Sequence, residues 1–462
     1  MFRDQIAPHA DRVDRQQRDI LPADALAVLV EKAPADQRDR TSDEQDKGPA
    51  GDPPPQVQRH HQRRERGGAG AIILQGGEQR LAPGMIAQID PFHAIAISRE
   101  AHALKAQGRS ILHMEFGQPS TGAPAAAIAL AHEVLDTDPM GYWESPALKE
   151  RIARLYADRH NVAVDPEQVL LTCGASPGLV LALTSLFAPG ARVATARPGY
   201  VAYRNTLKAL YVEPVEIACG PAERYQISAD ALAAIDPAPD GLILASPANP
   251  TGTIIPADEL AAIAKVCADR GIRIISDEIY HGLSFGEPAR SMLEFAPDAV
   301  IVNSFSKYFS MAGWRLGWIV VPADLIGAAR ARMGNLFLTP PVLAQQAGLA
   351  AFDCTDELEG HVDTYRRNRQ LLLDALPALG LASIAPPDGA FYIYADISHL
   401  TNDSLAFCQK LLRETGVATA PGIDFDPVDG HRFIRFSFAV STDRVEDAIA
   451  RMIPWFQAQP AR

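Results

Sequence analysis

The feature that most constrains the fold is a regular alternation of short apolar runs with helical stretches between about residues 168 and 325. The apolar runs are Val169–Thr172, Arg192–Thr195, Val212–Ile217, Leu242–Ala245, Ile272–Ser276, Ala299–Asn303 and Gly317–Val321. Helical stretches separate several of these runs, notably Pro177–Phe187 and Ala257–Asp269. Strands that alternate with helices predict an α/β fold with a mostly parallel seven-stranded sheet. Because ligands bind beyond the C-terminal ends of such strands, the residues after each run are the candidates for function.

The helical and strand patterns in the rest of the chain predict a second, smaller domain of α+β type, built from the N- and C-terminal parts. Its C-terminal part has helical patterns at Leu343–Phe352, Val362–Leu376, Asp403–Thr415 and Arg444–Phe456, and strands at Ala390–Tyr394 and Arg432–Ala439. Ahead of the sheet we expect a helix at Pro91–Ala106, a strand at Ile111–Phe116 and a helix at Pro146–Ala157 that Ser145 precedes. The predicted divisions are an N-terminal arm and part of the small domain over 85–130, a large ligand-binding domain over 131–340, and a C-terminal small domain over 341–462.

Residues 1–84 differ in composition from everything that follows. They are dense in Arg, Asp, Gln, Pro and Gly, with little periodic apolar pattern. Such a segment buries too little apolar surface to offset its ordering entropy. We expect a disordered extension, translated from an upstream start codon, so that a chain starting at Met85 is fully active. The basic cluster Arg59–Arg66 leaves a nucleic-acid or membrane tether as the alternative.

Composition argues against several classes of protein. The 43 Lys and Arg residues and 56 Asp and Glu residues give a net charge of −13, which argues against a general nucleic-acid binder. The five cysteines are scattered without a CxxC pair, so neither a disulfide framework nor a metal site is expected. No apolar run has the length of a membrane span, and the N-terminus lacks a signal-peptide pattern. These features indicate a cytoplasmic enzyme that acts on small molecules.

The stretch Asn303–Tyr308 carries the most specific chemistry. Two serines and Lys307 follow the apolar run, and Arg315 comes eight residues after the lysine, between glycines at 313 and 317. Lysine forms Schiff bases with aldehydes, and arginine is a strong phosphate ligand. A lysine, hydroxyls and an arginine together fit an aldehyde cofactor that carries a phosphate, for which pyridoxal phosphate is the candidate.

Two other strand ends suit a phosphate and a planar ring. The run Val169–Thr172 meets Cys173–Gly178, where Ser176 is expected to cap a helix whose free N–H groups would bind an anion. The run Arg192–Thr195 meets Pro198-Gly199-Tyr200, which places an aromatic ring where it can stack on a heterocycle.

Two more strand ends supply polar groups. Asn249 lies between Pro247 and Pro250, in a rigid turn that would hold its amide in one orientation. Asp277 follows the run Ile272–Ser276, where a carboxylate is costly unless it pairs with a cation. The protonated ring nitrogen of the cofactor would be that cation. Tyr280 could reach the phenolate oxygen of the same ring.

In this combination of motifs the chain resembles the fold-type I, pyridoxal-phosphate-dependent aminotransferases of class I/II (aspartate aminotransferase-like), over about residues 86–458. The most specific matches are Ser304-Phe305-Ser306-Lys307 with Arg315, Asn249-Pro250-Thr251-Gly252, and Asp277-Glu278-Ile279-Tyr280. The resemblance implies that Lys307 forms the Schiff base, Asp277 pairs with the ring nitrogen, Asn249 and Tyr280 hold the ring oxygen, and Tyr200 stacks on the ring. It further implies that the phosphate is held by the Ala175 N–H, Ser176, Ser304, Ser306 and Arg315.

The same resemblance implies residues for the substrate and for a partner subunit. Arg435 matches the family arginine that grips the substrate α-carboxylate, for which a guanidinium fork is well shaped; Arg432 is the competing candidate. Gly117 matches the glycine whose backbone borders that carboxylate, and we also assign Asn249 to the substrate site. Tyr142 matches a tyrosine that reaches the phosphate in the other subunit, which implies a homodimer with shared active sites.

The implied activity is ping-pong transamination between an L-amino acid and a 2-oxo acid, in amino acid metabolism and biosynthesis. Lys307 would move the proton between the substrate Cα and the cofactor. A C–S β-lyase or a related lyase or synthase on the same fold is the alternative. A regulator fused to a DNA-binding module is a rival of another class, but residues 1–84 offer no pair of amphipathic helices. Neutral, aromatic and acidic amino acids all stay open as substrates, although Ser176 stands where some aspartate-preferring relatives carry a lysine.

Overall fold

The computed structural model describes residues 87–460 and residue 462, so the expectations for residues 1–84 fall outside the described part. Within that part, none of the helices is both long and apolar enough to cross a membrane. The same residues contain no cluster of His, Cys, Asp and Glu side chains that could hold a metal ion.

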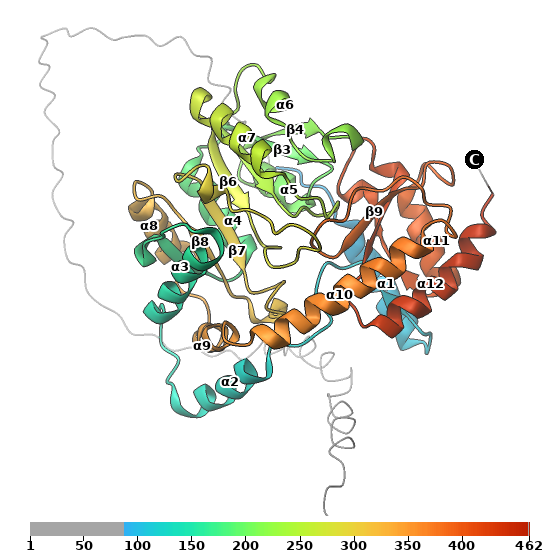
Figure 1. The fold of residues 1–462 in the computed structure, drawn as a ribbon, viewed down its shortest axis with the longest axis horizontal. Helices are drawn as coiled ribbons and strands as arrows, with labels where there is room; N and C mark the ends of the chain where they lie inside the picture. The colour runs from blue at the N-terminus through green and yellow to red at the C-terminus, as the bar shows by residue number, and fades with distance from the viewer. Residues whose placement is uncertain (1–86, 461) are drawn as a thin grey trace, which may run out of the picture. The chain divides into compact units, whose positions relative to one another are not determined.

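A seven-stranded sheet forms the centre of the described chain (Figure 1). Its strands are β2 (Val169–Thr172), β3 (Arg192–Arg197), β4 (Glu213–Ala218), β5 (Gly241–Ala245), β6 (Arg273–Asp277), β7 (Val300–Ser304) and β8 (Gly317–Val320). They lie in the order β2-β8-β7-β6-β5-β3-β4. Strand β8 is antiparallel to both of its neighbours, and the other neighbouring pairs are parallel. The predicted mostly parallel seven-stranded sheet is therefore confirmed.

Both faces of this sheet are buried, which explains why its strands read as continuous apolar runs. Successive side chains of a strand point to opposite faces. In β2, Leu170 packs in a cluster with residues of α4 (Ala175–Leu186) and α8 (Ile326–Leu336). The next residue, Leu171, packs in a separate cluster that includes residues of α7 (Ala257–Arg270). An apolar residue at every position is thus required by helices on both sides.

The helices predicted outside the sheet are present. They are α1 (His93–Ala106), α3 (Pro146–His160), α9 (Val342–Ala351), α10 (Thr355–Ala375), α11 (Ser404–Thr415) and α12 (Thr442–Gln457). The start of α3 confirms the sequence signal, because the Ser145 side chain accepts a hydrogen bond from the Leu148 N–H at 3.2 Å and Pro146 occupies the first turn. Helices α2 (Ala125–Thr137), α5 (Val201–Ala209), α6 (Ala229–Ala233) and α8 were not predicted.

Two smaller sheets lie in the other part of the chain. Strands β11 (Ala420–Pro421), β12 (Phe433–Ser437) and β9 (Tyr392–Asp396) form an antiparallel sheet in the order β11-β12-β9. Strand β1 (Leu112–His113) pairs in parallel with β10 (Val417–Ala418). The strand predicted over Ile111–Phe116 is therefore shorter than expected. Its partner strand, β10, is only two residues long. The Glu115 carbonyl accepts a hydrogen bond from the Arg435 side chain instead of from a neighbouring strand.

Candidate active site

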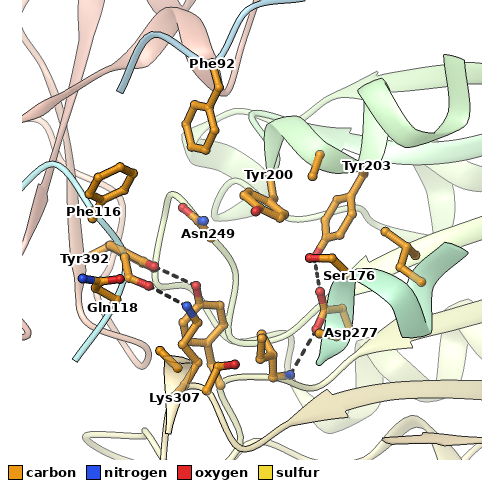
Figure 2. A pocket seen from close by; sticks show the side chains of 18 of the residues that line it. Phe92, Phe116, Gln118, Ser176, Tyr200, Tyr203, Asn249, Asp277, Lys307 and Tyr392 are labelled. Carbon is orange, nitrogen blue, oxygen red and sulfur yellow. Dashed lines mark hydrogen bonds between the residues drawn. The ribbon is translucent and has the colours of Figure 1, made fainter. Parts of the chain in front are cut away.

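The residues that follow the central strands converge on a pocket of about 370 Å³, shown in Figure 2. Convergence at the C-terminal edge of a parallel sheet is the arrangement that the strand order predicts. The sequence-predicted residues that line the pocket are Gly117, Ala175, Ser176, Tyr200, Asn249, Asp277, Tyr280, Ser306, Lys307, Arg315 and Arg435.

Asp277, the last residue of β6, is a buried carboxylate that faces the pocket. Its Oδ2 accepts a hydrogen bond from the Tyr203 hydroxyl at 2.6 Å, and its Oδ1 accepts one from the Ile279 N–H at 3.1 Å. Burial raises the pKa of this carboxyl group, while these two hydrogen bonds and the positive charge of Lys307 oppose the rise. A cation placed in the pocket beside Asp277 would therefore be strongly favoured.

Lys307 follows β7 and reaches into the same pocket (Figure 2). Its Nζ donates a hydrogen bond to the Gly117 carbonyl oxygen at 2.5 Å and lies 5.7 Å from the centre of the Tyr280 ring. Burial and the nearby charges of Arg435 and Arg315 lower the pKa of Lys307 to about 8, although Asp277 favours the protonated form. The uncharged, nucleophilic form of this amine is therefore much more populated near neutral pH than in an ordinary lysine.

Arg435 in β12 is 1% exposed and is fixed on every side. Its Nη1 donates to Asn249 Oδ1 at 2.8 Å, and its Nη2 donates to the Glu115 carbonyl oxygen. The rings of Tyr392 and Phe425 lie 4.5 and 4.7 Å from its guanidinium carbon, and Nε is buried without a hydrogen-bond partner among the described residues. The competing candidate, Arg432, is half exposed beside Asp429 and does not line the pocket.

Gly174 and Arg315 form a narrow cradle at the start of α4. Gly174 is the N-cap residue with a φ of +96°, and a Cβ at this position would lie 2.5 Å from Arg315 Nη2. Arg315 itself donates to the Ala312 and Cys173 carbonyl oxygens. The prediction that Ser176 caps the helix is wrong, because α4 begins at Ala175, two residues before the predicted start at Pro177, and no side chain caps it. The N–H groups of the first turn are thus left for an anion.

Gly117 lies against Tyr392, whose hydroxyl is hydrogen-bonded to that of Tyr280. The two tyrosine hydroxyls are 2.7 Å apart, and burial raises the pKa of Tyr392 to about 12. A Cβ at position 117 would lie 1.8 Å from the Tyr392 hydroxyl oxygen. Only glycine fits here, so that its carbonyl can also reach Lys307.

Comparison with known proteins decides what this pocket belongs to. Residues 115–452 match the family model described as aminotransferase class I and II. The chain belongs to the class I and II aminotransferases. It is therefore an enzyme that uses pyridoxal phosphate to exchange an amino group between an amino acid and a 2-oxo acid in a ping-pong reaction.

Individual aminotransferases align with nearly the whole of the described part of the chain. The valine–pyruvate aminotransferase of Mycobacterium tuberculosis is 47% identical over 380 residues, which are 81% of this chain and 98% of that protein. The aspartate aminotransferase of Geobacillus stearothermophilus is 30% identical over 391 residues, covering 81% of this chain and 98% of its own. Since these relatives are named aminotransferases, the C–S β-lyase alternative is not favoured.

Solved aminotransferase structures share the fold. A crystal structure of an aminotransferase from Mycobacterium tuberculosis superposes with a TM-score of 0.79 at 46% identity, covering 81% of this chain and 99% of that one. The aspartate aminotransferase of Thermus thermophilus with maleate gives a TM-score of 0.74 at 29% identity, covering 79% and 97%.

The side chains of this aminotransferase fit pyridoxal phosphate. Asp277 is a buried carboxylate without a cationic partner within hydrogen-bond range among the described residues, which suits a protonated ring nitrogen. The Gly174–Arg315 cradle and the uncapped start of α4 suit a phosphate. Lys307 suits the aldehyde, because its amine faces the same space.

Two predicted residues do not line the pocket. Ser304, at the end of β7, is 2% exposed, and its hydroxyl accepts a hydrogen bond from the Ser306 N–H at 3.1 Å. Tyr142 is 85% exposed. Ser304 therefore supports the turn that carries Lys307, and the role expected for Tyr142 stays a prediction about an assembly of two chains.

Several pocket residues were not predicted from the sequence. They include Phe92, Phe116, Gln118, Tyr203 and Tyr392. Tyr203 lies three residues after Tyr200, at the spacing that places two side chains on one face of a helix, and this was an available signal. Phe116 directly precedes Gly117, but nothing local distinguished it from a core residue.

Phe92 directly precedes α1 and lines the pocket, and the residues before and after it are fixed by polar contacts. Two residues earlier, Asp90 pairs with Arg204 at 3.0 Å and with Lys208 at 2.9 Å. On the other side, the Asp424 carboxylate accepts hydrogen bonds from the first two N–H groups of α1, at 2.7 and 2.8 Å. The ring of Phe92 contacts Tyr200 edge-on, with centroids 6.5 Å apart.

Proposed function

We propose that this aminotransferase takes a small or branched neutral amino acid, such as valine or alanine, with pyruvate as a matching 2-oxo acid. The observation that carries the proposal is the charge of the pocket. Among the described residues that line it, the cations are Lys307, Arg315 and Arg435. The first two are assigned to the cofactor, so one guanidinium is left, which is enough for the α-carboxylate but not for a second carboxylate.

The shape and a relative support the same substrate class. Phe92 and Phe116 lie at the substrate end of the pocket, where they offer apolar surface to a side chain (Figure 2). The Mycobacterium tuberculosis relative at 47% identity is named for valine and pyruvate. More distant relatives, near 30% identity, are named for aspartate.

An amino-donor panel tests this proposal. Valine, alanine, leucine, phenylalanine and aspartate should be compared with pyruvate and with 2-oxoglutarate as acceptors. We expect kcat/KM for valine with pyruvate to exceed that for aspartate by at least about tenfold, the scale of one lost charged contact. A preference for aspartate would overturn the proposal while leaving the transaminase activity itself intact.

We assign the cofactor-binding roles to residues as follows. Pyridoxal phosphate supplies an aldehyde that condenses with amines and a ring that accepts the electron pair of the Cα–H bond. Asp277 would hold the ring nitrogen protonated, Asn249 and Tyr280 would hold the ring oxygen, and Tyr200 would stack on the ring. The phosphate ligands in this proposal are the Ala175 N–H, Ser176, Ser306 and Arg315, with Ser304 placed behind Ser306.

Lys307 and Arg435 act on the substrate in this proposal. Arg435, with Asn249 and the Gly117 backbone beside it, would bind the α-carboxylate and fix where the Cα lies. Lys307 would then take the proton from Cα and return it to the cofactor. Its lowered pKa, about 8, supports this role because a larger fraction of the amine is unprotonated near neutral pH than in an ordinary lysine.

We further propose a homodimer in which Tyr142 of each chain completes the phosphate site of the other. The exposure of this large aromatic side chain, 85%, supports the idea that a second chain covers it. Mass determination by light scattering would test the assembly, and Tyr142→Phe would test the role: a dimer with weakened cofactor affinity is expected.

The remaining proposals concern domain division and cellular role. We propose that residues 131–340 form the cofactor-binding domain and that residues 85–130 and 341–462 form the smaller one, which the pairing of β1 with β10 supports. We also propose a cytoplasmic enzyme of amino acid biosynthesis, because amino acids and 2-oxo acids meet in that compartment.

A further inference from the structure

Glu278 is a buried acid that the proposed reaction does not use. It follows Asp277, is 1% exposed, and its side chain contacts Ser276. Three donors converge on its Oε1: the Ser276 hydroxyl at 3.2 Å, the Ser291 hydroxyl at 2.9 Å and the Met292 N–H at 2.9 Å. Its Oε2 is buried and has no hydrogen-bond donor among the described residues.

His281 is the group that Oε2 faces. Its Nδ1 lies 3.5 Å from Glu278 Oε2, and its Nε2 lies 3.1 Å from the Ser246 carbonyl oxygen. Because a carbonyl can only accept, the ring proton must be on Nε2. Burial, with the positive charges of His160 and Arg159 adding to it, lowers the pKa of His281 to about 3. The ring is thus neutral and Nδ1 is an acceptor.

Two acceptors would face one another if Glu278 were ionised. A carboxylate oxygen opposite a bare ring nitrogen is repulsive, whereas a proton on Oε2 converts the contact into an O–H···N hydrogen bond. Burial raises the pKa of Glu278 to about 8 and the neighbouring Glu294 adds to the rise, although the three hydrogen bonds to Oε1 oppose it. The burial of the side chain and the lack of a donor for Oε2 together favour a neutral acid.

The other titratable groups that face the pair come from α3 and from the 3-10 turn at Met292–Glu294. The rings of His160 and His281 are 5.3 Å apart, and His160 Nδ1 lies 3.1 Å from Glu294 Oε1. Glu294 also accepts a hydrogen bond from Arg290, and burial lowers the pKa of His160. Burial raises the pKa of the Tyr156 hydroxyl in α3, and the nearby Glu278 adds to that rise. Among the described residues, no Lys or Arg side chain forms an ion pair with Glu278.

We propose that protonated Glu278 donates a hydrogen bond to His281, and that this neutral pair positions the cofactor-binding residues. The pair joins the segment from Asp277, the last residue of β6, to Tyr280 with Ser246, which begins the turn that carries Asn249. It rests on the proposed function, because these three residues are assigned there to the cofactor. A neutral Glu278 would add no second negative charge next to that of Asp277, the residue proposed to pair with the ring nitrogen.

The protonation state is tested by thermal unfolding of the apoenzyme between pH 5 and 8. Native Glu278 keeps its proton up to about pH 8, whereas an unfolded glutamate releases it near 4.5, so the native state loses stability as pH rises between these values. Glu278→Gln keeps the hydrogen bonds and removes the titration. The Tm of the variant minus the Tm of the unchanged protein should therefore increase by about 2 °C or more from pH 5 to pH 8.

The positioning role is tested by the affinity for pyridoxal phosphate, measured by equilibrium dialysis at 25 °C. Glu278→Gln should hold the Kd within about twofold, while Glu278→Ala and His281→Phe should weaken it by about tenfold or more. Glu287→Gln, an exposed acid in the same loop, is the matched control and should change neither Kd nor Tm.

Three outcomes would overturn the proposal. A lower Tm for Glu278→Gln at pH 6, or a Kd as weak as that of Glu278→Ala, would mean that Glu278 is ionised. Unchanged Kd values in Glu278→Ala and His281→Phe would mean that the pair is merely structural. If Glu278→Ala fails to fold, the Glu278→Gln and His281→Phe results still decide. An unchanged Kd in Asp277→Asn would instead refute the assigned cofactor roles.

Discussion

The Tyr203 hydroxyl donates a 2.6 Å hydrogen bond to the Asp277 carboxylate across 74 residues of sequence. Both groups are buried, and this bond opposes the rise in the pKa of Asp277 that burial causes. Tyr203 thus helps to keep a negative charge at the end of β6, where the protonated ring of the cofactor is expected.

Replacing Tyr203 by Phe should weaken pyridoxal phosphate binding by about tenfold to a hundredfold, because a hydrogen bond to a charged group contributes roughly 1.5–3 kcal/mol. Equilibrium dialysis against the cofactor measures this directly. Tyr308→Phe is a matched control, since it removes a 2.6 Å bond from a tyrosine to Glu359 outside the pocket. Equal cofactor affinities in the two variants would contradict the role of Tyr203.

Replacing Lys307 by Ala should abolish the visible absorbance of the lysine–cofactor Schiff base and reduce turnover by at least about a thousandfold. Absorbance spectra and single-turnover measurements with valine would show both effects. Lys265→Ala, at an exposed lysine, should behave like the unchanged protein. Near-normal turnover in the Lys307 variant would remove Lys307 from the chemistry.

Reconstitution of the apoenzyme should accelerate with pH. Condensation with an aldehyde needs the unprotonated amine, and the pKa of Lys307 is lowered to about 8. The rate should therefore rise about tenfold per pH unit below 8 and level off above it. Stopped-flow absorbance after mixing with pyridoxal phosphate gives the profile. A midpoint near 10.5, the ordinary value for lysine, would show that burial and the two arginines do not act on this amine.

Arg435→Lys should raise KM for amino acids and lower kcat/KM by about thirtyfold to a hundredfold, since a lysine cannot reproduce a two-pronged contact with a carboxylate. Steady-state kinetics with valine tests this. Arg432→Lys serves as the control because that side chain is half exposed and outside the pocket. A larger effect at position 432 would reverse the assignment.

Phe92→Ala should widen the range of amino acids accepted. The contacts of Asp90 and Asp424 hold Phe92 in place, so truncation leaves space rather than a shifted loop. We expect the ratio of kcat/KM for phenylalanine to that for valine to rise by about tenfold. Ile89→Ala, at a neighbouring exposed side chain, should leave that ratio unchanged.

The sheet could be predicted because helices cover both of its faces, so each strand is an apolar run such as Ile272–Ser276 ahead of Asp277. Pocket residues directly after these runs, such as Asn249 and Lys307, could be predicted for the same reason. Tyr392 could not, because a strand tyrosine has the same local pattern whether it contacts the core or a ligand.

The start of α4 was misjudged for a local reason. Gly174 adopts a left-handed conformation, which ends the strand and begins the helix before Ser176 can act as a cap. Likewise, the strand pattern at Ile111–Phe116 is cut short by a partner that is only two residues long. Only the second error came from a contact outside the segment itself.

Two different sheets supply the walls of the pocket. The cofactor side comes from the ends of the central strands, and Arg435 and Tyr392 come from the antiparallel sheet β11-β12-β9. The two side chains proposed to contact the substrate side chain, Phe92 and Phe116, belong to neither sheet. Inherited changes at these phenylalanines can therefore alter which amino acid is accepted without disturbing the groups proposed for the shared chemistry. Diversification by gene duplication needs such a separation, because a drifting copy stays catalytically competent while its preference changes.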